Sequence, residues 1–141
     1  MAKQDFASQV GAFVAKSDAR MTAVFRQSAQ ELIIEAQTPR GKSGNMPVDT
    51  GFLRNSGVAS LNTLPSGESI KPDNYAGGGW SADEAALIIA RAKLGDRIIF
   101  GWVAQYSIYM EARYGWLRLA VQNWPQTVNR VAKETERRMR K

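Results

Sequence analysis

The chain has 141 residues, of which 44% are hydrophobic, and its net charge is +6 at pH 7. This length suits one domain with a core but not two ordinary ones, so we expect a single domain over residues 1–141. Cysteine and histidine are both absent, which excludes disulfides, thiol nucleophiles, the usual zinc sites and serine–histidine or cysteine–histidine catalysis. We find neither a signal-peptide pattern nor a run of roughly 20 apolar residues. We therefore expect a soluble protein made in the cytosol, without a membrane partner.

A long amphipathic helix is predicted over residues 4–37, where large apolar residues recur at spacings of three, four and seven. These residues are Phe6, Val10, Phe13, Val14, Met21, Val24, Phe25, Leu32 and Ile33. Pro39 disfavours helix at Thr38 and lacks an amide donor, so we expect the helix to end there. A loop follows over residues 39–47 by composition.

The middle of the chain predicts short elements. Residues 52–64 alternate in part and predict one or two strands, whereas residues 65–80 are dense in loop-forming residues and predict a flexible loop. A helix is predicted over residues 82–93, because Ser81 begins a pattern that resembles a capping box. Branched and aromatic residues over 97–104 predict a strand.

A second long helix is predicted over residues 116–138. The apolar residues along one side of it are Leu117, Val121, Trp124, Val128, Val131 and Met139. Pro125 predicts a kink, or a restart with this proline in the first turn. We place Trp102 and Trp124 in the core. The expected fold class is α+β, with long N-terminal and C-terminal helices packed on a small antiparallel sheet and a short middle helix.

The tripeptide Asp49-Thr50-Gly51 raises the question of an aspartic protease, because these enzymes hold their catalytic carboxylate in such a turn. They are almost entirely β, whereas this chain predicts two long helices. We favour a structural role, in which Asp49 and Thr50 bond to backbone amides and Gly51 permits a bend into a strand that begins at Phe52. On that strand Leu53 points inward and Arg54 points outward, toward a carboxylate of the same or another chain.

Two further patterns carry little chemistry. Gly41-Lys42-Ser43 resembles the end of a phosphate-binding loop, but Ala36 stands where that motif needs a glycine. Asp83, Glu84 and Asp96 each have a structural role in a turn or a helix start. We therefore expect no enzyme activity, no cofactor and no metal site.

Exposed aromatic and basic residues indicate contacts with partners. Burial against another subunit is favoured over nucleic-acid stacking for the aromatic residues outside the core, above all for Trp80. The end of the chain, from Arg130 to Lys141, carries six basic and two acidic residues. These cations either lie at the solvated end of a helix or contact DNA or an acidic partner. The residues concerned are Arg137, Arg138, Arg140 and Lys141.

The segment from Pro47 to Ser56, PVDTGFLRNS, resembles the "PvDTGxLRxS" signature of tail-completion and head–tail joining (neck) proteins of long-tailed phages. This family includes minor tail proteins of lambdoid phages. The segment YSIYMEARYG, from Tyr106 to Gly115, is similar to the "Y-A-x-x-x-E-x-G" segment that follows in such proteins, with Ser107 in place of alanine. The order of helix, motif, strands, tyrosine–glutamate segment and helix covers nearly the whole chain.

The resemblance implies a structural protein of the virion, assembled in the cytoplasm of the host bacterium. It would form a hexameric ring that completes the tail and joins it to the head, with DNA passing through the lumen. Its partners would be its own copies and other neck and tail-tube or terminator proteins, and Arg54 would pair with a carboxylate such as Glu111. The expected motif and interface residues are Asp49, Thr50, Gly51, Leu53, Arg54, Ser56, Trp80, Tyr106, Tyr109, Glu111 and Tyr114.

Two other functions remain open at this point. The alternative reading is a basic nucleic-acid-binding module that uses the cations of the last helix with exposed aromatic residues. An enzyme of the aspartic protease class is the third reading.

Overall fold

The computed structural model describes residues 5–65, 71–73, 75, 77 and 79–140. It confirms the predicted mixture of helix and strand, with a long helix at each end of the chain and a two-stranded antiparallel sheet. Half of the loop expected over residues 65–80 lies outside the described residues. The same holds for Lys141 and for residue 4, where the first helix was expected to begin.

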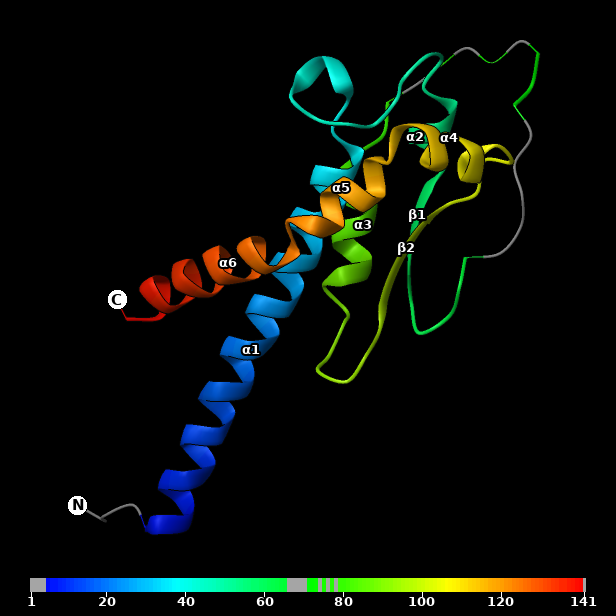
Figure 1. The fold of residues 1–141 in the computed structure, drawn as a ribbon. Helices are drawn as coiled ribbons and strands as arrows, with labels where there is room; N and C mark the ends of the chain where they lie inside the picture. The colour runs from blue at the N-terminus through cyan, green and yellow to red at the C-terminus, as the bar shows by residue number, and fades with distance from the viewer. Residues whose placement is uncertain (1–4, 66–70, 74, 76, 78, 141) are drawn as a thin grey trace.

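Helix α1 spans Phe6–Gln37. It begins where the carboxylate of Asp5 accepts a hydrogen bond from the amide of Ser8 at 2.7 Å, a side-chain N-cap. It ends at Thr38, which is extended, as expected before a proline. The loop that follows contains the 3-10 turn η1, Arg40–Lys42. Figure 1 shows the N-terminal half of α1 projecting well beyond the rest of the molecule.

The prediction that residues 52–64 are strand is wrong in its first part. Phe52–Asn55 forms the short helix α2, and strand β1 covers only Gly57–Leu61. The amide of Asn55 donates to the carbonyl of Gly51 at 2.9 Å, so the chain makes one helical turn before it extends. Strand β2 spans Ile98–Trp102, within the predicted 97–104, and pairs with β1 from Gly57↔Trp102 to Leu61↔Ile98.

Helix α3 spans Ala82–Ile89 and stops before residue 93, where the predicted helix was expected to end. Helix α4, Ser107–Tyr114, follows β2 and was not predicted. The long C-terminal helix is divided into α5, Trp116–Gln122, and α6, Trp124–Met139. Pro125 stands in the first turn of α6, where its missing amide costs no hydrogen bond.

The core lies around the C-terminal half of α1, which packs against α3, α5 and α6, while α3 covers β1. Its two buried clusters centre on Met46, Leu53 and Trp116 and on Ile33 and Ile89. The core position predicted for Trp124 is wrong, because 36% of this residue is exposed. It does lie on the apolar side of α6, but the neighbouring helices leave that side partly uncovered.

Candidate functional site

The segment Asp49–Ser56, which we call the corner, turns the chain from the loop after α1 into β1. Gly51 has a φ of 88°, a left-handed conformation that costs glycine little and other residues much more. The hydroxyl of Thr50 accepts a hydrogen bond from the amide of Phe52 at 3.3 Å. Asp49 and Thr50 are both exposed. The tripeptide therefore starts a helical turn, where a strand was expected.

Two side chains anchor the corner to the body. Leu53 is buried in the core cluster that holds Met46 and Trp116. Ser56 is also buried, and its hydroxyl donates to the carbonyl of Leu53 at 2.7 Å. The carbonyl of Ser56 accepts from the amide of Val103 at 3.2 Å. Both ends of α2 are thus fixed, by apolar burial and by hydrogen bonds.

Gln37, the last residue of α1, joins the corner to the sheet. Only 1% of this residue is exposed. Its side-chain amide donates to the carbonyl of Arg54 at 2.9 Å and accepts from the indole N–H of Trp102 at 2.9 Å. A buried amide is costly unless it is paired, and here both ends are. We did not single out Gln37 from the sequence, although its position four residues after Ile33 places it on the buried side of α1.

The expected pairing of Arg54 with Glu111 is wrong within this chain. The Nε of Arg54 donates to the backbone carbonyl of Gln37 at 2.7 Å, and its guanidinium carbon lies 5.5 Å from the ring centre of Trp80. The carboxylate of Glu111 instead accepts from the amides of Leu117 and Arg118, each at 3.0 Å. Because Arg54 belongs to a helical turn, the in-and-out alternation of a strand does not govern its direction.

Aromatic rings connect the corner to α4. The ring of Phe52 lies 5.2 Å from that of Tyr75 and 6.2 Å from that of Tyr106, the residue before α4. A cavity of about 230 Å³ beside them is lined by Asp49, Leu53 and Tyr106 among others. Burial raises the pKa of Tyr106, and the negative charge of Asp49 acts in the same direction. The phenol therefore stays neutral near pH 7, as a packing group with one polar end.

The cavity offers limited acid–base chemistry. Among the described residues that line it, Asp49 is the single carboxylate. A proton-sharing pair of the aspartic protease type would need a second Asp49 from another copy. In the part of the chain that the structure describes, no cluster of acidic side chains could hold a metal ion.

Helix α4 carries a strongly exposed apolar pair. Ile108 is 79% exposed and Tyr109 is 77% exposed. Tyr114, at the end of the same helix, is instead covered by guanidinium groups, with that of Arg40 at 4.8 Å and that of Arg113 at 5.4 Å from its ring centre. Of the two tyrosines of α4 expected at an interface, Tyr109 is thus the one presented to solvent.

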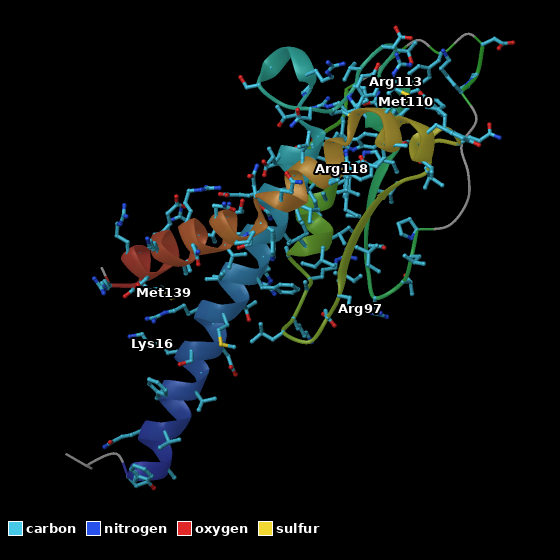
Figure 2. The ribbon with its side chains drawn as sticks, in the orientation of Figure 1. Lys16, Arg97, Met110, Arg113, Arg118 and Met139 are labelled. Atoms are coloured by element: carbon cyan, nitrogen blue, oxygen red, sulfur yellow. The ribbon has the colours of Figure 1, made fainter. Side chains whose placement is uncertain are left out.

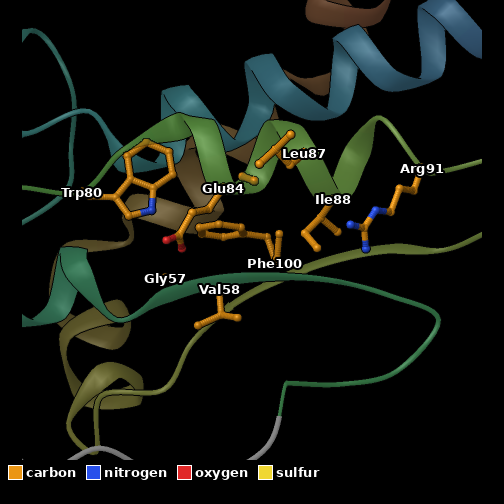
Figure 3. Close-up of a pocket in the computed structure, with 10 residues that line it drawn as sticks. Gly57, Val58, Trp80, Glu84, Leu87, Ile88, Arg91 and Phe100 are labelled. Carbon is orange, nitrogen blue, oxygen red and sulfur yellow. The ribbon is translucent and has the colours of Figure 1, made fainter.

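A cavity of about 350 Å³, which we call the α3–β1 hollow, lies between α3 and the sheet. Figure 3 shows Trp80, Ile88 and Phe100 around it, with Glu84 of α3 and Arg91, which follows α3, nearby. The rings of Trp80 and Phe100 meet edge to face, 6.1 Å apart. Trp80, expected at an interface, therefore forms part of the wall of a recess that apolar residues line together with Glu84 and Arg91.

The basic residues expected to contact DNA or an acidic partner lie on α6. Arg137 and Arg138 are exposed near its end. Arg140, just beyond the helix, is paired with Glu136 at 2.6 Å. Farther back on α6, Arg130 bonds to Glu31 of α1 at 2.6 Å, and this hydrogen bond raises the pKa of Arg130. Of the expected contact residues that the structure describes, Arg137 and Arg138 are thus exposed and have no salt bridge.

Comparison of the chain with protein families, with characterised proteins and with solved structures finds no match. No helix within the described residues is long and apolar enough to cross a membrane.

Proposed function

We propose that this chain is a structural protein of a phage virion, a subunit of a hexameric ring in the neck. The ring completes the tail and joins it to the head, and DNA passes through its lumen. The proposal starts from the motif at Pro47–Ser56, whose resemblance to neck proteins is described above. The geometry of the corner agrees with a structural role, because the side chains of Thr50, Arg54 and Ser56 are hydrogen-bonded to the backbone of the same chain.

The observation that carries the proposal is a pair of unlike surfaces on one subunit. One is the exposed apolar pair Ile108 and Tyr109 of α4, and the other is the partly apolar α3–β1 hollow. A closed ring needs heterologous contacts, in which one surface of a subunit meets a different surface of the next. In the proposed ring, the exposed pair on α4 of one copy enters the α3–β1 hollow of its neighbour.

The corner contributes by holding α4 in place. Phe52 packs against Tyr106, and the carbonyl of Tyr106 accepts a hydrogen bond from Met110 at 3.2 Å in the first turn of α4. The corner itself is fixed through Leu53 and Gln37. A rigid connection between core and contact helix limits the entropy that is lost when subunits assemble.

The proposal is tested with Ile108→Asp in the full chain. The variant should keep the far-ultraviolet circular dichroism of the wild type, because Ile108 is outside the core. It should fail to form rings by mass measurement, and lysates should contain filled heads and finished tails that are not joined. Leu64→Asp is the matched control, since Leu64 is also strongly exposed but belongs to neither surface. Normal yields of infectious particles from Ile108→Asp would contradict the proposal.

Substitution of Arg54 gives a less clean test. Arg54→Glu removes the bond to the Gln37 carbonyl and places a carboxylate beside that oxygen. A loss of joining in this variant would therefore mix a folding defect with an assembly defect.

The exposed cations of α6 favour a second candidate, a basic nucleic-acid-binding module. Arg137 and Arg138 stand next to each other at the free end of the helix. Affinity for DNA that falls steeply with salt, and falls again in the double variant Arg137→Glu with Arg138→Glu, would support it. Arg130→Glu is a useful control, because Arg130 is already paired with Glu31.

A further inference from the structure

The N-terminal half of α1 presents an apolar stripe that its own chain does not cover. The stripe consists of Phe6, Val10, Phe13, Val14 and Met21, all of them exposed, with Phe6 at 81% and Phe13 at 71%. These positions recur every three to four residues or at seven, so they lie along one side of the helix. Contiguous exposed apolar surface of this kind marks an interaction site.

The stripe continues into an open groove between α1 and α6, which we call the α1–α6 groove. This groove has a volume of about 540 Å³. Its apolar lining consists of Met21, Val24, Phe25, Trp124, Val128 and Ala132. Figure 2 shows Lys16 and Met139 on these two helices, which diverge toward their free ends. Met21 belongs to the stripe and also lines the groove, so the two apolar surfaces adjoin.

We propose that a second copy of this chain covers this surface, with the two α1 stripes packed antiparallel about a two-fold axis between residues 13 and 14. Phe6 of one copy then lies opposite Met21 of the other, beside the α1–α6 groove. From Phe6 to Met21 the stripe is about 22 Å long, at 1.5 Å per residue. Because Met21 lines the α1–α6 groove, the tip of a partner helix that runs in the opposite direction reaches this groove.

Charge complementarity supports a second copy as the occupant. Asp5, Gln9, Lys16 and Arg20 follow one another at spacings of four, seven and four, so they form one flank of the stripe. In an antiparallel pair with two-fold symmetry this flank faces its own counterpart. Asp5 at one end then comes close to Arg20 of the other copy, and the symmetry makes this contact twice. Within the described residues neither side chain has a salt bridge in its own chain.

This contact is isologous, so it closes with two copies and cannot by itself generate a ring. It uses neither the exposed pair on α4 nor the α3–β1 hollow. The paired α1 helices therefore go beyond the proposed ring: they predict a dimer of the free protein, whether or not that protein functions in a neck.

Cross-linking tests the pairing directly, because the full chain contains no cysteine. Val10 of one copy lies opposite position 17 of the other, since opposed residue numbers add up to 27. Oxidation of a mixture of Val10→Cys and Ser17→Cys chains should give a covalent heterodimer in high yield. Each single variant alone should give much less. Efficient cross-linking of Val10→Cys with itself, or none in the mixture, would overturn the antiparallel arrangement.

Sedimentation over a range of protein concentration tests whether the stripe is the contact. Wild-type protein should pass from monomer to dimer, and Phe13→Glu should raise the dimer dissociation constant at least tenfold. Ala15→Glu is the matched control: the same residue is introduced two positions after Phe13, on the side of the helix that faces away from both the stripe and its charged flank. The dissociation constant should then change less than twofold. Wild-type protein that stays monomeric at every concentration would overturn the proposal. So would wild-type protein that associates through the stripe only when other neck proteins are added.

The two proposals fail separately. Ile108→Asp should leave the dimer intact while it abolishes rings, and Phe13→Glu should weaken the dimer of the free protein at least tenfold. A dimer without any ring or neck phenotype would refute the proposed function alone. Rings formed by a protein that is monomeric when free would refute the α1 pairing alone.

Discussion

The two ends of α1 differ in which kind of side chain they bury. At the C-terminal end a polar residue, Gln37, is almost completely buried, whereas at the N-terminal end Phe6 and Phe13 are mostly exposed. Buried polar groups and exposed apolar surfaces are the informative exceptions to the usual distribution. The first end is where the chain completes its own fold, with hydrogen bonds that satisfy the amide. The second end has apolar surface left over, which indicates a contact outside the chain.

The largest effect is expected at the buried end. Gln37→Leu removes the partners of the Arg54 carbonyl and of the Trp102 indole N–H. Each of these two partly buried groups costs about 1–3 kcal/mol when left unpaired, so the free energy of unfolding should fall by about 2–6 kcal/mol. Urea denaturation measures this change. Gln126→Leu, the same substitution at an exposed position of α6, should change stability by no more than about 0.5 kcal/mol. Equal losses of stability in the two variants would show that the hydrogen bonds of the Gln37 side chain contribute nothing specific to the fold.

The second effect concerns the space around that amide. A Cβ added to Gly57 would lie 2.6 Å from the Nε2 of Gln37 and 2.6 Å from the Cζ of Phe100. Gly57→Ala should therefore push the amide away from its partners, at a cost of about 1–3 kcal/mol, which is typical of an overpacked core. Gly101→Ala on β2 is the matched control, because its Cβ would meet nothing within 4 Å. A loss in Gly101→Ala as large as in Gly57→Ala would point to strand propensity as the cause.

The sequence predicted the elements that depend on regular patterns better than those that depend on distant partners. The periodicity of α1 and the stop at Pro39 are local signals, and the structure has both. The same periodicity does not tell which part of the apolar side is covered, so the exposure of Phe13 and Trp124 could not be read from it. Coverage depends on where α6 crosses α1, which is a property of the whole fold.

The corner was misread because two local signals competed. Leu53 and the residues after it suggested alternation, but Gly51 and Thr50 start a helical turn, and Arg54 then points toward Gln37 and Trp80. The hydrogen bonds of the Gln37 side chain could not be predicted from the sequence, since its partners lie 17 and 65 residues away along the chain. Glu111 was expected at an interface, and in this chain it caps α5.

A smaller effect, of opposite sign, is expected at the exposed end. Gly11 lies inside α1, where glycine is less favourable than alanine by about 0.5–1 kcal/mol. A Cβ there would meet nothing within 4 Å, and the position is to one side of the apolar stripe. Gly11→Ala should therefore raise the helix content without weakening the dimer, as circular dichroism and sedimentation can show. A weaker dimer in Gly11→Ala would mean that the partner helix approaches α1 on this side.

The smallest effect is the pH dependence of the first turn of α1. Hydrogen bonding from Ser8 lowers the pKa of Asp5, the N-cap of the helix. A carboxyl with a lowered pKa stabilises the folded state fully above its ordinary value of about 3.9, and this contribution is lost as pH falls through the lowered pKa. Hydrogen exchange of the Ser8 amide should therefore lose protection in acid. Asparagine caps helices about as well but does not titrate, so Asp5→Asn should remove this pH dependence while protection near neutral pH is retained. The same acid-induced loss in both proteins would show that the first turn frays for another reason, such as dissociation of the α1 pair.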